Sequence, residues 1–272
     1  LEREVPPAFL RWEGPVLMLA AWCLLLASPF SLGEVGLSWD ALNHHIYLGW
    51  AAEQHRFDRD FLGAGYQSFQ SPYLYWPFYK MAASGWTGAS AGVVIASMHV
   101  LVVWPVWMLA RACLPGESVF DLAMRALAVA LAFMSSVVLS AIPTSMNDVL
   151  AATPLVWAVA LAIEPAARHR GMPSAKAGYF VLLSGLAAGL SVGLKLSNGP
   201  LAICMPALWL LCASEIRGRL VAVLLGSGAA VAGFVLGYGH WAWVLWKHFG
   251  NPVYPFHHFK FTPLRDWLGW VG

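Results

Sequence analysis

Long apolar runs recur along almost the whole chain, and they constrain its fold more than any other feature. A helix needs about 20 mostly apolar residues to cross the hydrocarbon layer of a bilayer. Charged residues make up only 11% of the chain and hydrophobic residues 59%, whereas a soluble domain has roughly 25% charged residues. We therefore predict an all-α integral membrane protein, with residues 1–272 forming a single transmembrane domain.

The apolar runs predict a bundle of about seven transmembrane helices. The predicted spans cover residues 15–32, 90–112, 126–142, 145–163, 177–194, 199–213 and 220–246. The chain has no initiating Met and stops just after the start of another polar segment. We therefore expect an N-terminal fragment of a longer protein.

Lys and Arg residues of the short connections indicate the orientation of the bundle. They fall in alternate connections, at Arg111 and Arg125, at Arg168, Arg170 and Lys176, and at Arg217 and Arg219. Because cytoplasmic loops are rich in Lys and Arg, these connections and the N-terminus are expected in the cytoplasm. The long loop 33–89 and the segment 247–272 are then extracytoplasmic.

Glycines recur on the later predicted spans. They are Gly185, Gly189 and Gly193 on one span, and Gly226, Gly233, Gly237 and Gly239 on the last. Rows of small residues allow two membrane helices to approach closely. We expect a neighbouring helix to pack against each row.

Loop 33–89 is too long to be a simple connector, and its first part has the pattern of an amphipathic helix. Ser38 can cap a helix on which polar residues share one face, namely Asp40, Asn43, His44 and Tyr47. Leu42, Ile46 and Gly49 occupy the opposite face, as a helix that lies on the bundle requires. This pattern predicts a short interfacial helix that starts near Ser38 and lies along the outer membrane surface.

Two lysines stand out near the predicted outer surface. Lys195 interrupts an apolar run, where an uncompensated ammonium group is costly, so it should reach water or a partner such as Asp148. Lys247 and His248 follow several tryptophans at the end of the last span. A cation between indoles can bind a lipid phosphate, or it can be a snorkelling lysine in an aromatic belt.

Four segments of the chain resemble bacterial multi-spanning proteins of the GT-C superfamily of membrane glycosyltransferases. They read WDALNHHIYLGWA, RDFLGAGYQSFQSPYLYWPFY, GLSVGLKLSN and FGNPVYPF. The resemblance implies a location in the bacterial inner membrane, a periplasmic active face and a sugar donor carried on polyprenyl phosphate. It also implies an acidic catalytic residue in the first outer loop. Asp40 is the residue that matches by position, although Ala41 stands where better-known members have a second acidic residue.

These inferences give a set of candidate site residues. Asp40 is the expected catalytic base, and His44 lies one turn away, where it can orient Asp40 or share the proton. The candidates for substrate binding are Lys195, Lys247, His248, Tyr66, Gln67 and Asn251. An alternative for Asp40 is a helix-start carboxylate held by backbone N–H groups.

The sequence gives no clear metal site or cofactor. His44 and His45 are adjacent, as are His257 and His258, and adjacent side chains on a regular helix point about 100° apart. A divalent cation bound by Asp40 and His44 is kept as an alternative. Asp58 and Asp60 alternate with arginines, which is typical of solvated ion pairs.

Two other classes of function compete with a glycosyltransferase. A transporter or flippase for a lipid-linked or anionic substrate would need polar residues near the bilayer midplane, whereas here they gather at the outer ends of the spans. A non-catalytic subunit of a membrane complex would have no cavity beneath loop 33–89. The expected partners are a polyprenyl-phosphate-linked sugar and membrane lipids, and a net charge of only +2 does not indicate nucleic acid.

Overall fold

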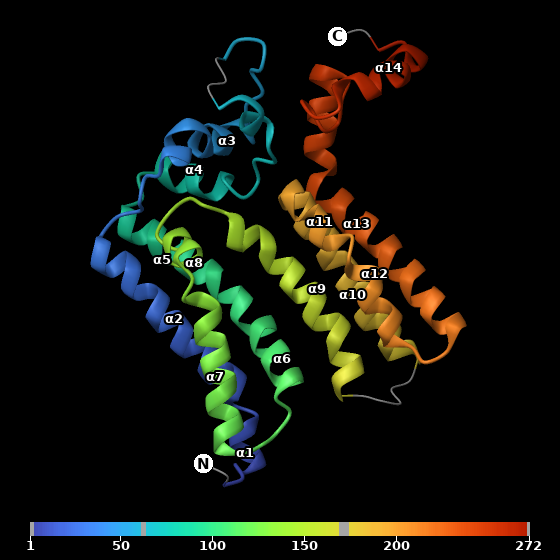
Figure 1. Cartoon of the computed structure of the whole chain (residues 1–272). Helices are drawn as coiled ribbons and strands as arrows, with labels where there is room; N and C mark the ends of the chain where they lie inside the picture. Colours follow the sequence, from blue (N-terminus) through green and yellow to red (C-terminus); the bar gives the residue numbers. More distant parts are fainter. Residues whose placement is uncertain (1–2, 61–63, 169–173, 271–272) are drawn as a thin grey trace.

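The computed structural model describes residues 3–60, 64–168 and 174–270, whose regular structure is helical (Figure 1). Within these ranges there are isolated β-bridges between Glu4 and Ser118 and between Gly36 and Thr144, but no sheet. The first part of the chain forms α1 (Pro7–Leu10), α2 (Glu13–Leu32), α5 (Gly88–His99), η3 (Val100–Val102), α6 (Val103–Cys113), α7 (Val119–Phe133) and α8 (Ser136–Ala141).

The loop between α2 and α5 is itself helical in places. It contains η1 (Ala41–His45), α3 (Ile46–Ala51), η2 (Gly65–Phe69) and α4 (Trp76–Ala83). The second part of the chain forms α9 (Asp148–Arg168), α10 (Ser174–Leu194), η4 (Leu196–Asn198), α11 (Gly199–Ala202), α12 (Met205–Trp209), η5 (Leu210–Cys212), α13 (Ile216–Phe249), η6 (His258–Phe261) and α14 (Thr262–Leu268).

Four helices of the described chain are long and apolar enough to cross a membrane. They are Glu13–Leu32, Gly88–Cys113, Lys176–Leu194 and Ile216–Phe249. Their presence supports the prediction of a helical multi-pass membrane protein. Three predicted spans do not belong to this group, so the number seven stays a prediction.

The structure gives a local reason for two of these three differences. The predicted span 126–142 is divided between α7 and α8, because Ser135 leaves the helical path and its hydroxyl caps α8 by accepting from the N–H of Val138. The predicted span 199–213 falls in a shorter apolar helical stretch, Leu196–Cys212, which is divided into short pieces with prolines at the starts of α11 and α12. The third, 145–163, corresponds to α9.

Helices α10 and α13 pack against each other through their glycines, as predicted. A Cβ atom on Gly189 would lie 1.8 Å from the carbonyl oxygen of Ala230, and one on Gly185 would lie 2.2 Å from that of Gly226. From the other helix, a Cβ on Gly233 would lie 2.1 Å from the carbonyl oxygen of Leu186. The two backbones therefore touch directly, as in other small-residue interfaces of membrane helices.

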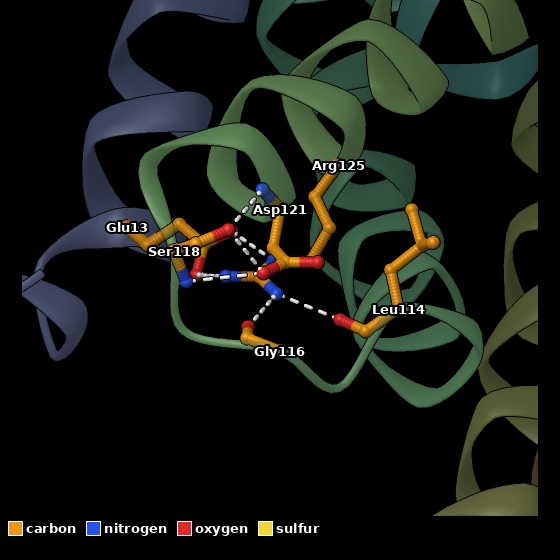
Figure 2. Close-up of polar contacts among 6 residues, drawn as sticks. All are labelled: Glu13, Leu114, Gly116, Ser118, Asp121 and Arg125. Atoms are coloured by element: carbon orange, nitrogen blue, oxygen red, sulfur yellow. Dashed lines mark hydrogen bonds and ion pairs between the residues drawn. The ribbon is translucent and has the colours of Figure 1, made fainter. Parts of the chain in front are cut away.

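A buried ion pair joins the N-terminal helix α2 to α7 (Figure 2). The guanidinium of Arg125 donates from Nε to Oε1 of Glu13 at 2.6 Å and from Nη2 to Oε2 at 3.0 Å. Its Nη1 donates to the carbonyl oxygens of Leu114 and Gly116, both at 2.7 Å. Only 1% of the Arg125 side chain is exposed. Arg125 is thus a neutralised interior residue, and the treatment of it as a loop cation in the topology prediction is wrong.

The two ends of the bundle differ in what they carry. Helix α1 and the start of α7 lie at one end, whereas α3, α4 and α14 lie at the other (Figure 1). The described parts of loop 33–89 and the C-terminal segment thus lie at one end of the bundle, and the side of the membrane that they face stays a prediction. The side chains of Arg168 and Arg170, which also entered the topology prediction, lie outside the described residues.

Candidate functional site

Loop 33–89 contains the helix that was predicted to start near Ser38. The hydroxyl of Ser38 accepts from the N–H of Ala41 at 3.1 Å, which confirms it as a cap. Gly49 is buried against α4, where a Cβ would lie 2.6 Å from the Cβ of Tyr79, as expected of a face that packs on its neighbours. Leu42 and Ile46, which were expected on the same packed face, are exposed instead. The prediction for Leu42 and Ile46 is therefore wrong.

The helix is widened to a π-type turn over Ala41–His45, where the N–H of Ile46 bonds to the carbonyl of Ala41. Both His44 and His45 are buried, and their ring centroids lie 4.5 Å apart. Nδ1 of His45 lies 2.8 Å from the hydroxyl of Ser145, and its ring stacks on that of Tyr75. Single π-type turns are frequent at functional sites. The sequence analysis assumed a regular helix and missed this turn.

His44 lies between the Asp40 carboxylate and the bundle. Its Nδ1 is 3.9 Å from Oδ1 of Asp40 and makes no hydrogen bond within the described part of the chain. Burial lowers the pKa of His44, against the opposing effect of the Asp40 charge, and Lys195 lowers it further. His44 is therefore a neutral imidazole at pH 7, with a free ring nitrogen facing a half-exposed carboxylate.

Lys195 connects this region to the bundle. Its Nζ lies 2.6 Å from Oδ1 of Asp148 and 3.3 Å from Oδ1 of Asn147. The prediction that Asp148 is its structural partner is confirmed. Asn147 is buried and also bonds to the hydroxyl of Tyr75, whose pKa is raised by burial. The charges of Asp40 and Lys195 both act on His44, so these three residues belong to one electrostatic neighbourhood.

A pocket of about 270 Å³ lies beside Lys195, beneath part of loop 33–89. It is lined by Tyr66, Gln67, Phe69, Gln70, Ser71, Leu194, Lys195, Leu196, Ser197, Tyr238, Tyr254 and Phe256. Three of the predicted substrate-binding residues, Tyr66, Gln67 and Lys195, therefore share one cavity. The lining does not include Asp40 or Lys247, so this pocket does not unite the three charges that the sequence analysis expected to converge.

The part of the loop above the pocket is held by α13. Trp241 donates from its indole to the carbonyl of Phe69 at 2.9 Å, and the hydroxyl of Tyr73 bonds to Nδ1 of His240. The ring of Phe69 packs edge-on against Tyr254. These contacts join segments far apart in the sequence, which is why sequence reasoning missed Ser71, Tyr238 and Tyr254 as pocket residues.

The other predicted substrate-binding residues, Lys247, His248 and Asn251, do not line the pocket. Lys247 is exposed, with its Nζ 5.2 Å from the ring centroid of Trp243, as in an aromatic belt. The ring of His248 contacts those of Phe57 and His55. Asn251 is fully buried, and its amide bonds to the carbonyl of Phe256 and the N–H of Val253. Asn251 therefore shapes the loop that brings Phe256 to the pocket.

The predicted ion pairs of the outer loop are confirmed, and no metal cluster is found in the described chain. Arg56 pairs with Asp60 at 3.2 Å and Arg59 with Asp58 at 3.4 Å. Within the described residues, no group of three or more His, Cys, Asp or Glu side chains is arranged to hold a metal ion. Asp40 and His44 would supply only two protein ligands to a cation.

Comparisons with protein-family profiles, with curated proteins and with solved structures gave no match.

Proposed function

We propose that the protein is a membrane glycosyltransferase of the GT-C type. It moves a sugar from a polyprenyl-phosphate donor to an extracytoplasmic glycan, lipid or protein acceptor. The observation that carries the proposal is the pocket beneath loop 33–89, which shares Lys195 with the neighbourhood of Asp40 and His44. Such a transfer requires a carboxylate that can take a proton and a pocket that can hold a substrate, and Lys195 links the two here.

In this proposal Asp40 is the base. Its side chain is 43% exposed, so an acceptor hydroxyl can reach it. The acceptor oxygen attacks the anomeric carbon while its proton passes to the carboxylate. The bond from that carbon to the phosphate oxygen breaks, and the phosphate leaves with the electron pair. Nδ1 of His44 lies 3.9 Å from the carboxylate, so a small side-chain shift would let His44 hydrogen-bond to Asp40 and orient it, and Lys195 is the cation in the pocket lining.

The proposed location is the bacterial inner membrane. The bundle would cross it seven times, with the N-terminus in the cytoplasm and the active face in the periplasm. The candidate spans and the shared position of loop 33–89 and the C-terminal segment support this arrangement.

A transporter or flippase is a weaker alternative. It needs polar groups that are open to a pathway through the bilayer. The buried hydroxyls of Ser184 and Ser191 instead donate to the carbonyl oxygens of Ala158 and Ala151, which ties neighbouring helices together. A non-catalytic subunit would have no use for a cavity beneath the outer loop, so the pocket favours an enzyme.

The first prediction tests the base. Asp40→Asn keeps the volume and polarity of the side chain but removes its proton affinity. We expect transfer from polyprenyl-phosphate hexoses or pentoses to fall by about 10²-fold or more, with an unchanged melting temperature in detergent. Asp58→Asn, which removes an exposed carboxylate of the same loop, is the matched control and should retain activity. Full activity in Asp40→Asn would refute the role of Asp40, and loss of folding would assign it to the start of the helix.

A further inference from the structure

The positive charge at the pocket is already compensated. Lys195 is the one cation of the lining described here, and its Nζ is held by Asp148 at 2.6 Å and by Asn147 at 3.3 Å. A phosphate that bound to Lys195 would have to displace the Asp148 carboxylate or bind beside it, at a cost in like-charge repulsion. The pocket is therefore poorly suited to an anion in its present form.

The rest of the lining consists of uncharged polar groups and aromatic rings. The polar groups are the side chains of Gln67, Gln70, Ser71 and Ser197. Ser71 is the informative one, because it is only 6% exposed and its hydroxyl oxygen is shielded from solvent and has no hydrogen-bond partner in the described chain. An unpaired buried hydroxyl is unfavourable, and rotation of the Ser71 side chain toward the pocket would let a ligand hydroxyl provide the missing partner.

The aromatic residues give the pocket flat apolar walls. Tyr66 and Phe256 come from the two outer segments, and their ring centroids lie 5.9 Å apart with the rings tilted. Such rings can cover the C–H face of a sugar while hydroxyls at its edge bond to amides and hydroxyls. The volume of about 270 Å³ is at the small end of ligand pockets, which suits a single ring.

From these features we infer that the pocket takes an uncharged sugar ring, and that the phosphate of a lipid-linked donor lies outside it. Tyr66 and Phe256 cover the ring, and Gln67 and Ser71 bond to its hydroxyls. The inference rests on the proposed function for its substrate class, but binding of a sugar requires no turnover. It assigns Lys195 a structural role at the pocket wall, as the partner of Asp148.

The test measures binding of free methyl glycosides to the full chain in detergent by saturation-transfer NMR. The probes are the methyl glycosides of common hexoses and pentoses, with inorganic phosphate and sugar-free polyprenyl phosphate as anionic competitors. We expect at least one glycoside to receive saturation and to stay bound in the presence of both anions. Gln67→Ala and Tyr66→Ala should each weaken its binding by about tenfold, the effect of one lost hydrogen bond or ring contact.

Tyr179→Ala is the matched control, because Tyr179 is as exposed as Tyr66 but lies on α10 outside the pocket lining. It should bind the glycoside like the wild type. Melting temperatures of all variants check their folding, and Ser71→Ala provides a third pocket variant if one unfolds. Glycoside binding that is absent or insensitive to the pocket variants would overturn the inference, as would displacement of the glycoside by either anion.

The experiments distinguish failure of the inference about the pocket from failure of the proposed glycosyltransferase function. Glycoside binding that depends on the pocket, without any transfer activity, would support the sugar-binding site and refute the proposed glycosyltransferase function. Transfer that depends on Asp40, without pocket-dependent glycoside binding, would refute only the inference about the pocket.

Discussion

His45 is a buried titratable side chain of loop 33–89 with a large pKa shift. It is 5% exposed, stacks on Tyr75 and bonds to Ser145. Burial, with a smaller effect of His44, lowers its pKa from 6.5 to about 4, while the nearby Asp40 and Asp148 carboxylates oppose the shift and Lys195 adds to it. The folded protein thus holds this ring in the neutral form at pH 7.

This pKa shift predicts a pH dependence of stability. Because the pKa is lower in the folded state, the unfolded chain binds the proton more tightly. The contribution of His45 to stability is therefore complete above about pH 6.5 and is lost as the pH falls toward about 4. We expect the melting temperature in detergent to fall less between about pH 7.5 and about pH 5 in His45→Asn than in the wild type.

Asn can keep the bond to Ser145 at the position of Nδ1 but does not titrate. His257→Asn is the control, since His257 is exposed and has a positive φ of 52°, which Asn tolerates. It should follow the wild type. An equal pH response in His45→Asn and the wild type would show that the imidazole of His45 is not the source of the dependence, and the neighbouring His44 would be tested next.

At the scale of the elements, helices α10 and α13 approach each other so closely that their backbones touch at the glycines. The outer end of α10 leads directly to Lys195, and α13 contributes Tyr238 and anchors the loop above the pocket. The pair is therefore the rigid wall on which the candidate site is built. Its spacing depends on the absence of side chains at Gly185, Gly189 and Gly233.

Gly189→Ala tests this dependence. The added methyl group would lie 1.8 Å from the carbonyl oxygen of Ala230, a backbone atom that cannot move without the helix. Separation of the helices should destabilise the protein by about 1–3 kcal/mol, measured by unfolding in mixed detergent. Gly178→Ala on the same helix meets only Leu225 at 3.8 Å, so it should be neutral or gain up to about 1 kcal/mol from helix propensity. Equal losses in the two variants would argue against close packing.

At the scale of the whole molecule, Glu13 and Arg125 connect residues separated by 112 positions in the chain. The pair (Figure 2) attaches α2 to α7 at the end of the bundle opposite α3, α4 and α14 (Figure 1). A buried ion pair of this kind is strongly destabilised when one partner is removed, because the other charge is left without compensation.

We predict that Arg125→Met destabilises the protein by about 3–5 kcal/mol in the same unfolding assay, and that Glu13→Leu in addition restores part of this loss. The restoration is partial because the carbonyl oxygens of Leu114 and Gly116 also lose their donor. A double-mutant cycle of Arg125→Met, Glu13→Leu and the double variant gives the coupling free energy between the two side chains. Additive effects would mean that the two side chains do not depend on each other.

The sequence by itself determined the class of the protein and several local features. Composition and apolar length led to a helical membrane protein, because too little polar surface is present to cover a soluble fold. The cap at Ser38, the glycine rows and the pairing of Lys195 with Asp148 were predicted from residue type and position, since each depends on near neighbours or on the cost of an unpaired charge.

The tertiary structure alone decided how the candidate site is assembled. The π-type turn at Ala41–His45, the burial of Asn251 and the position of Lys247 outside the pocket depend on how helices are rotated against one another. Ser71 meets Tyr238 and Tyr254 at the pocket from a distant part of the chain. Local sequence patterns do not predict such tertiary contacts, because the free energy that stabilises them comes from packing between segments and not from any one segment.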